Sequence, residues 1–142
     1  MKYLLDSNAC IAIINKSVSP NFEQSLNLAM RLGESLQLPS ISVHELWFGV
    51  AKSQRVAANS FNLTQFLNSS FEVLHFDGQD ARVAGEIRAE LARRGTPIGP
   101  YDVLIAGQAL ARGLTLVTAN TAEFSRVPGL RTADWRSESS TH

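Results

Sequence analysis

The sequence predicts an α/β fold in which helices cover both faces of a central, mostly parallel sheet. Short apolar runs of strand length alternate along the chain with longer segments whose apolar residues are spaced by three and four. Parallel strands need connections of this length, and helices usually form them. The 142 residues suit one domain with a substantial core. These observations together indicate a three-layer α/β/α architecture.

The first half of the chain is expected to hold two short strands and four helices. A buried strand at Tyr3–Leu5 ends at the turn-forming Asp-Ser-Asn, and a brief second strand lies around Ile41 and Val43. Gly33 continues the helical spacing of the residues before it, so the second helix is expected to reach Leu36, before Leu38-Pro39. The four helices are expected at Ala9–Ile14, Glu23–Leu36, Ser42–Ser53 and Val56–Leu67.

The second half continues the alternation with clearer boundaries. Gly95 and Pro97 mark the end of one helix, and Gly113 ends the next. The strands are expected at Phe71–Phe76, Leu114–Thr118 and Leu130–Thr132. The helices are expected at Asp80–Arg94, Tyr101–Arg112 and Thr121–Ser125.

Composition excludes several classes of protein. One cysteine, Cys10, rules out a disulfide scaffold or zinc ribbon, and a reducing compartment fits best. The N-terminus lacks the features of a signal peptide, and no stretch approaches the roughly 18 apolar residues that span a bilayer. We therefore expect a cytoplasmic protein without a membrane partner. The 13 basic and 13 acidic residues give a net charge of zero, which argues against bulk electrostatic binding of nucleic acid but allows a local basic groove.

Acidic or amide side chains follow several of the predicted strands. Asp6 ends the first strand, Glu45 lies in the helix after the second, Asp102 opens the helix after Gly99-Pro100, and Asn120 with Glu123 follows the last core strand. Ligands of parallel sheets bind beyond the carboxyl ends of the strands, so these side chains are expected to meet at that edge.

Each of these residues also has a purely structural interpretation. The Asp-Ser-Asn that begins at Asp6 suits a helix N-cap, and Ser42-x-x-Glu45 matches a capping box. Asp102 complements the dipole of the helix that it opens, and Asn120-x-x-Glu123 is another capping pattern. Helix capping therefore explains each position separately.

Carboxylates that converge at one edge repel one another unless a cation neutralises them. A set of oxygen ligands without histidine or cysteine favours Mg²⁺, or alternatively Mn²⁺, over zinc. Such an ion activates water and stabilises a leaving oxygen on phosphorus, which indicates hydrolysis of a phosphodiester or a phosphomonoester. The chain has no glycine-rich phosphate-binding loop, so a nucleotide cofactor is not expected.

The order of these residues resembles that of PIN-domain ribonucleases, and specifically of VapC-type toxins from bacterial toxin–antitoxin pairs. Four stretches carry the resemblance and cover nearly the whole domain. They are YLLDSNACI (Tyr3–Ile11), SVHELWFGVAKS (Ser42–Ser53), GEIRAELARRGTPIGPYDVLIAGQALARG (Gly85–Gly113) and LVTANTAEFSRVPGLRTADW (Leu116–Trp135).

The resemblance implies a role for each matching position. Asp6 and Asp102 correspond to the principal metal-binding aspartates, and Glu45 to a further catalytic acid. Thr118 matches a hydroxyl that supports the first aspartate, and Asn8 is a further supporting residue. The wider family often has Asp where Asn120 stands, so Glu123 is expected to supply the missing catalytic charge.

The resemblance also implies a substrate and partners. It predicts a metal-dependent endoribonuclease that cleaves RNA, with tRNA, including the initiator, as a candidate substrate, and a VapB-type antitoxin as its inhibitor. A homodimer within the toxin–antitoxin complex is expected, with Phe22–Leu38 as a candidate interface. Lys52 and Arg112 are candidate contacts for RNA phosphates.

Two alternative functions remain open from the sequence. Asn120 would suit a PIN-like module that has lost catalysis and only binds RNA or protein, and the carboxylates would also suit a metal-dependent phosphatase. In every case the domain is expected to span residues 1–136, followed by a polar tail at 137–142.

Overall fold

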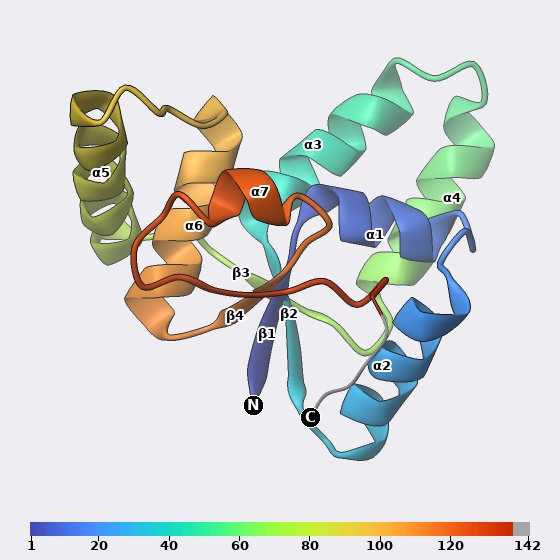
Figure 1. Ribbon diagram of the computed structural model, residues 1–142. Coiled ribbons are helices and arrows are strands. Elements are labelled where there is room, and N and C mark those ends of the chain that lie inside the picture. Colours follow the sequence, from blue (N-terminus) through green and yellow to red (C-terminus); the bar gives the residue numbers. More distant parts are fainter. Residues whose placement is uncertain (138–142) are drawn as a thin grey trace.

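Five parallel strands form the central sheet of the computed structural model, which describes residues 1–137 (Figure 1). Their order across the sheet is β3-β2-β1-β4-β5, and all four neighbouring pairs are parallel. The strands are β1 (Lys2–Leu5), β2 (Ser35–Pro39), β3 (Glu72–Leu74), β4 (Thr115–Val117) and β5 (Arg131–Ala133). The predicted α/β fold with a parallel sheet is confirmed.

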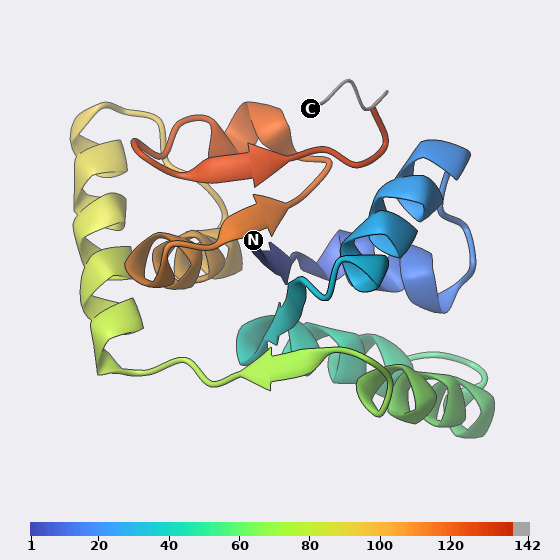
Figure 2. The same ribbon diagram turned by 90° about the horizontal axis from the view of Figure 1, so that it is seen from below.

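Helices cover both faces of this sheet, as Figures 1 and 2 show from two directions. On one side lie α1 (Ser7–Ile14), α2 (Pro20–Arg31), α3 (Ser40–Ala51) and α4 (Val56–Leu67). On the other lie α5 (Gly78–Arg93) and α6 (Pro100–Arg112). The short helix α7 (Thr121–Phe124) follows β4 and lies near the carboxyl ends of the strands.

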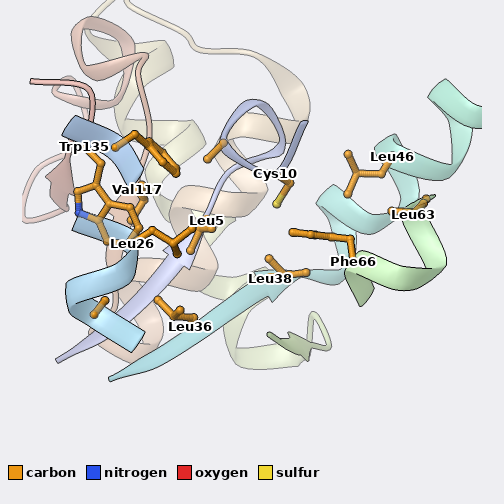
Figure 3. Close-up of a cluster of buried hydrophobic side chains, with 13 residues drawn as sticks. Leu5, Cys10, Leu26, Leu36, Leu38, Leu46, Leu63, Phe66, Val117 and Trp135 are labelled. Carbon is orange, nitrogen blue, oxygen red and sulfur yellow. The ribbon is translucent and has the colours of Figure 1, made fainter. Parts of the chain in front are cut away.

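Alternating apolar residues in the strands explain why the fold has two cores. Leu5 and Val117 belong to the cluster under α1–α4, whereas their neighbours Leu4 and Leu116 belong to the cluster under α5 and α6. Successive side chains of a strand point to opposite faces, and all four of these are fully buried. Figure 3 shows the first cluster, where Cys10 packs as a small apolar residue.

The structure corrects the sequence analysis in one region, between residues 31 and 43. The helix expected to reach Leu36 ends at Arg31, and residues 35–39 form β2. Gly33 adopts a φ of +68°, a left-handed conformation that terminates the helix rather than continuing it. The strand expected around Ile41 and Val43 is wrong, because both residues belong to α3. The other elements agree with their predicted positions to within about three residues.

The same correction changes the interface expected at Phe22–Leu38. Phe22, Leu26, Leu36 and Leu38 are buried inside the domain, so most of this segment stabilises the protomer itself. Among its large apolar residues, those with exposed side chains are Leu28, Met30 and Leu32.

The described part of the chain contains no helix that is long and apolar enough to cross a membrane. Of the polar tail expected at 137–142, all but Ser137 lies outside the described residues.

Strand order determines where a ligand site is expected. The chain passes from β1 to β2 on one side, and later places β4 on the other side of β1. The carboxyl ends of β1 and β4 therefore flank the point where the direction of winding reverses. In open parallel sheets, ligands bind beyond the strands at this point.

Candidate active site

Four carboxyl side chains lie close together at this carboxyl edge of the sheet. Asp6 directly follows β1, Glu45 lies in α3, Asp102 in the first turn of α6, and Glu123 in α7. The charges of Glu123, Glu45 and Asp6 all raise the pKa of Asp102, in addition to the larger effect of burial. The structure thus brings together the four acids that were predicted from distant parts of the sequence.

Asp6 is the most buried of these acids, at 6% exposure, and both of its oxygens accept hydrogen bonds. The backbone N–H of Ala9 donates to Oδ1 at 2.8 Å, and the Thr118 hydroxyl donates to Oδ2 at 2.6 Å. The backbone N–H of Asn120 in turn donates to the Thr118 hydroxyl at 2.9 Å. Burial raises the pKa of Asp6, and these hydrogen bonds oppose the increase. Asp6 therefore caps α1 and faces the other carboxylates at the same time.

Asp102 and Glu123 form a hydrogen-bonded pair of carboxyl groups. Burial and the adjacent Glu123 raise the pKa of Asp102 to about 7. The hydrogen bond from Asp102 lowers the pKa of Glu123, against the opposing effect of burial. Two adjacent carboxylates repel each other when both are ionised and no cation compensates them, so Asp102 keeps its proton to a higher pH than a free aspartate does.

Glu45 is positioned by a contact that the sequence analysis missed. The Ser7 hydroxyl, in the first turn of α1, donates a hydrogen bond of 2.7 Å to Oε1 of Glu45 in α3. The two residues are 38 positions apart in the sequence, so no local pattern predicts the bond. The available signal was that Ser7 follows Asp6 directly, in the turn that enters the site.

Two of the predicted capping boxes do not form. The helix that contains Glu45 begins at Ser40, so Ser42 is not its N-cap, and the Glu45 side chain accepts from Ser7 instead. Asn120 occupies the N-cap position of α7 but makes no capping side-chain bond. Glu123 accepts a hydrogen bond from the distant backbone N–H of Gly99, at 3.2 Å, which links α7 to the segment before α6. Helix capping alone therefore does not explain Glu45 or Glu123.

The group of donors suits a hard divalent cation. All are oxygens, and a Cβ at Gly99 would lie 3.1 Å from Oδ2 of Asp102 and 3.8 Å from Oε1 of Glu123, so this glycine keeps the space beside the pair open. Within residues 1–137, no three acidic, histidine or cysteine side chains are already arranged around one metal position. An incoming ion would therefore have to compete with protonation of Asp102 for these oxygens.

The remaining predicted residues differ in how they relate to this cluster. Asn8 and Thr118 line a cavity of about 170 Å³ beside Asp6. Lys52 lies at the end of α3, with Nζ 4.8 Å from the centre of the Phe48 ring.

Arg112 lies at the opposite end of α6 from Asp102, where its guanidinium donates two hydrogen bonds to Asp80, at 2.9 and 3.2 Å. Asp80 is 1% exposed, so this pair neutralises a buried charge. The structure thus gives Arg112 a stabilising contact within the domain, and the RNA contact expected from the sequence stays a prediction.

Glu123 can be tested by replacement with glutamine. Glu123→Gln keeps an acceptor for the Gly99 N–H and removes the charge. If Glu123 supplies the missing charge at the site, its loss should weaken metal binding. We then expect the rate of RNA cleavage to fall by about tenfold or more and to recover in part at higher Mg²⁺ concentration. The melting temperature should change little. A variant that cleaves at the parent rate would show that three carboxylates suffice.

Comparison with known proteins gives consistent matches over almost the whole chain. The model of the PIN domain family matches residues 3–130. The chain is 44% identical over 136 residues to the tRNA(fMet)-specific endonuclease VapC of Shigella flexneri, covering 95% of this chain and 98% of that protein. It is 38% identical over 135 residues to ribonuclease VapC2 of Rickettsia felis, again covering 95% of this chain and 98% of that protein.

Solved structures give the same result. The crystal structure of VapBC2 from Rickettsia felis, bound to a DNA fragment from the promoter, matches with a TM-score of 0.87 and 37% identity over 95% of this chain and 99% of that chain. The crystal structure of DNA-bound VapBC from Salmonella typhimurium matches with a TM-score of 0.86 and 43% identity, over 95% of this chain and 98% of that chain.

Proposed function

This chain belongs to the PIN-domain family, and we propose that it is the endoribonuclease toxin of a VapBC-type toxin–antitoxin pair, with Asp6, Glu45, Asp102 and Glu123 as its catalytic acids. The observation that carries the proposal is the convergence of these four carboxyl groups; burial and, to a smaller extent, the neighbouring charges raise the pKa of Asp102 to about 7. The relatives are named as endonuclease or ribonuclease, which favours phosphodiester hydrolysis over phosphatase action and over a purely binding module.

The chain's own residues would each perform a distinct step. Asp6 and Asp102 would hold a divalent cation, which when bound supplies activated water and stabilises charge on phosphorus. Thr118 keeps the Asp6 carboxylate in place through its 2.6 Å bond, and Ser7 does the same for Glu45 at 2.7 Å. Asp102 and Glu123 would be held as ionised carboxylates beside a bound cation, because the ion would offset the repulsion that raises the pKa of Asp102.

The proposed cofactor is Mg²⁺, with Mn²⁺ as a substitute, because all the donors at the site are oxygens. We expect the purified protein to cleave RNA with either ion, to lose activity in excess chelator, and to remain inactive with zinc. Cleavage would be followed on labelled RNA with each ion added in turn to the chelated protein. Full activity in chelator would contradict the metal-dependent mechanism.

The proposed partner is a VapB-type antitoxin that covers the acidic edge, since structural relatives are VapBC complexes. The proposed substrate is tRNA, with initiator tRNA as the first candidate because of the name of the Shigella relative. Mapping of cleavage sites across total RNA after brief induction would test the substrate. Relief of growth inhibition by the co-expressed antitoxin would test the partner.

A further inference from the structure

Arg126 lies beside the carboxylate cluster and has no role in the mechanism described above. It follows α7, between Phe124 and Val127, whose side chains are 1% and 3% exposed. The backbone N–H of Arg126 donates to the Glu123 carbonyl at 3.2 Å, and that of Val127 to Phe124 at 3.1 Å. The backbone is therefore anchored on both sides, whereas the Arg126 side chain is exposed.

The guanidinium of Arg126 is held at the edge of the site. Its Nη1 donates to the Pro97 carbonyl at 3.0 Å. Pro97 lies two residues before Gly99, whose N–H donates to Glu123 and at which a Cβ would lie 3.1 Å from Oδ2 of Asp102. The positive charge of Arg126 also acts on Glu123 directly, as one of the influences that lower its pKa. The hydrogen bond to Pro97 thus places this cation at the edge of the acid cluster, consistent with its effect on Glu123.

Arg126 and Arg131 differ from the ion-paired arginines in what they bind, and Arg131 begins β5, at the opposite edge of the sheet from the acids. Within residues 1–137, several arginines form ion pairs with carboxylates, whereas the side-chain hydrogen bonds of Arg126 and Arg131 go to carbonyl oxygens. The paired residues are Arg82, Arg93, Arg94, Arg112 and Arg136. One bond leaves most of the five guanidinium N–H donors of Arg126 available, in a planar fork that matches two oxygens of a phosphate.

RNA must bring its phosphates to an edge of the protein that carries four acids, and the chain as a whole has no net positive charge. We propose that Arg126 binds a phosphate of the RNA substrate next to the one that is cleaved, an inference that rests on the proposed ribonuclease function. The contact offsets the repulsion between that phosphate and Glu123, and it fixes the register of the backbone across the site.

Two substitutions separate the charge of Arg126 from its geometry. Arg126→Gln keeps a donor for the Pro97 carbonyl but removes the charge, and Arg126→Lys keeps the charge but removes the fork. Arg31→Gln is the matched control, because this exposed residue ends α2 ahead of β2, at the opposite edge of the sheet. The probe is a short fluorescent oligoribonucleotide that the parent protein cleaves, measured in single turnover.

For the Arg126→Gln variant, we expect the enzyme concentration that gives half-maximal cleavage to rise about tenfold, with a smaller effect on the maximal rate. The slope of log affinity against log salt concentration should fall by about 0.7, the value for one phosphate contact on a single strand. Arg126→Lys should keep this slope and lose only part of the affinity, and Arg31→Gln should resemble the parent.

A second measurement distinguishes RNA binding from support of the 97–99 segment. Because Arg126→Gln removes a positive charge near the carboxylates, the variant should bind Mg²⁺ at least as strongly as the parent protein. Mg²⁺ binding is followed by the rise in melting temperature when Mg²⁺ is added. If Arg126→Gln weakens Mg²⁺ and RNA binding together, the residue acts through the site's structure and the inference is overturned. An active parent with Arg126→Gln equal to Arg31→Gln would also overturn it. A parent that cleaves no RNA would overturn the proposed function, and this inference with it.

Discussion

Asp6→Asn is expected to reduce RNA cleavage by about two to three orders of magnitude while leaving the protein folded. Asparagine has nearly the same shape and keeps an oxygen acceptor, so it can preserve the cap on the Ala9 N–H at 2.8 Å. It lacks the negative charge that would hold a divalent cation at the carboxyl edge of β1. The loss should therefore appear in the rate rather than in the fold.

The measurement is cleavage of labelled RNA together with growth inhibition after induction, at equal soluble expression. Glu86→Gln is a suitable control, because this acid lies on the exposed surface of α5 in an ion pair with Arg82. Its neutralisation should leave both activity and toxicity unchanged. Retained toxicity in Asp6→Asn would refute the assignment of Asp6.

The four acids could be predicted from the sequence because each occupies a recognisable place relative to a strand or helix end. Asp6 ends an apolar run, and Asp102 lies two residues after Pro100, which opens α6. Parallel strands bring their carboxyl ends to one edge whatever the details of packing. That the four acids meet at one edge of the sheet could therefore be predicted from the local sequence patterns together with the fold class.

The contacts that position these acids could not be predicted in the same way. The Ser7–Glu45 bond joins residues 38 positions apart, and the Gly99–Glu123 bond joins residues 24 positions apart. Such pairings depend on how helices pack, which a single sequence does not specify. The error at residues 31–43 has a different cause, since Gly33 fits a helical spacing and a helix-ending turn equally well.

Asp102→Asn is expected to abolish cleavage and, at the same time, to stabilise the metal-free protein above neutral pH. The pKa of Asp102 is about 7 in the folded chain and 3.8 as a free side chain. At pH values between 3.8 and about 7, the Asp102 carboxyl keeps its proton in the folded state and has lost it in the unfolded state. The stability of the parent therefore falls as pH rises through this range, and the full cost of the buried charge is present above pH 7.

Asparagine cannot ionise, so the variant avoids this cost. Asp102 is only half-buried, and after allowance for screening by solvent we expect a gain of about 1 to 2 kcal/mol in the free energy of unfolding near pH 8. The gain should fall to roughly a third of this value near pH 5, because the folded carboxyl is protonated there but the unfolded one is not, and it should vanish only below the unfolded pKa of 3.8. Denaturant unfolding in chelator at both pH values measures the difference.

Added Mg²⁺ should reverse the order of stability, because the ion neutralises the carboxylates of the parent and binds the variant weakly. Glu86→Gln again serves as the control, and it should show no such dependence on pH or metal. If Asp102→Asn were less stable than the parent at both pH values, the acids at this edge would not be repelling one another. The electrostatic basis of the proposed metal site would then be wrong, whereas a pH-dependent gain would show that the site sacrifices stability to hold charge for its cation.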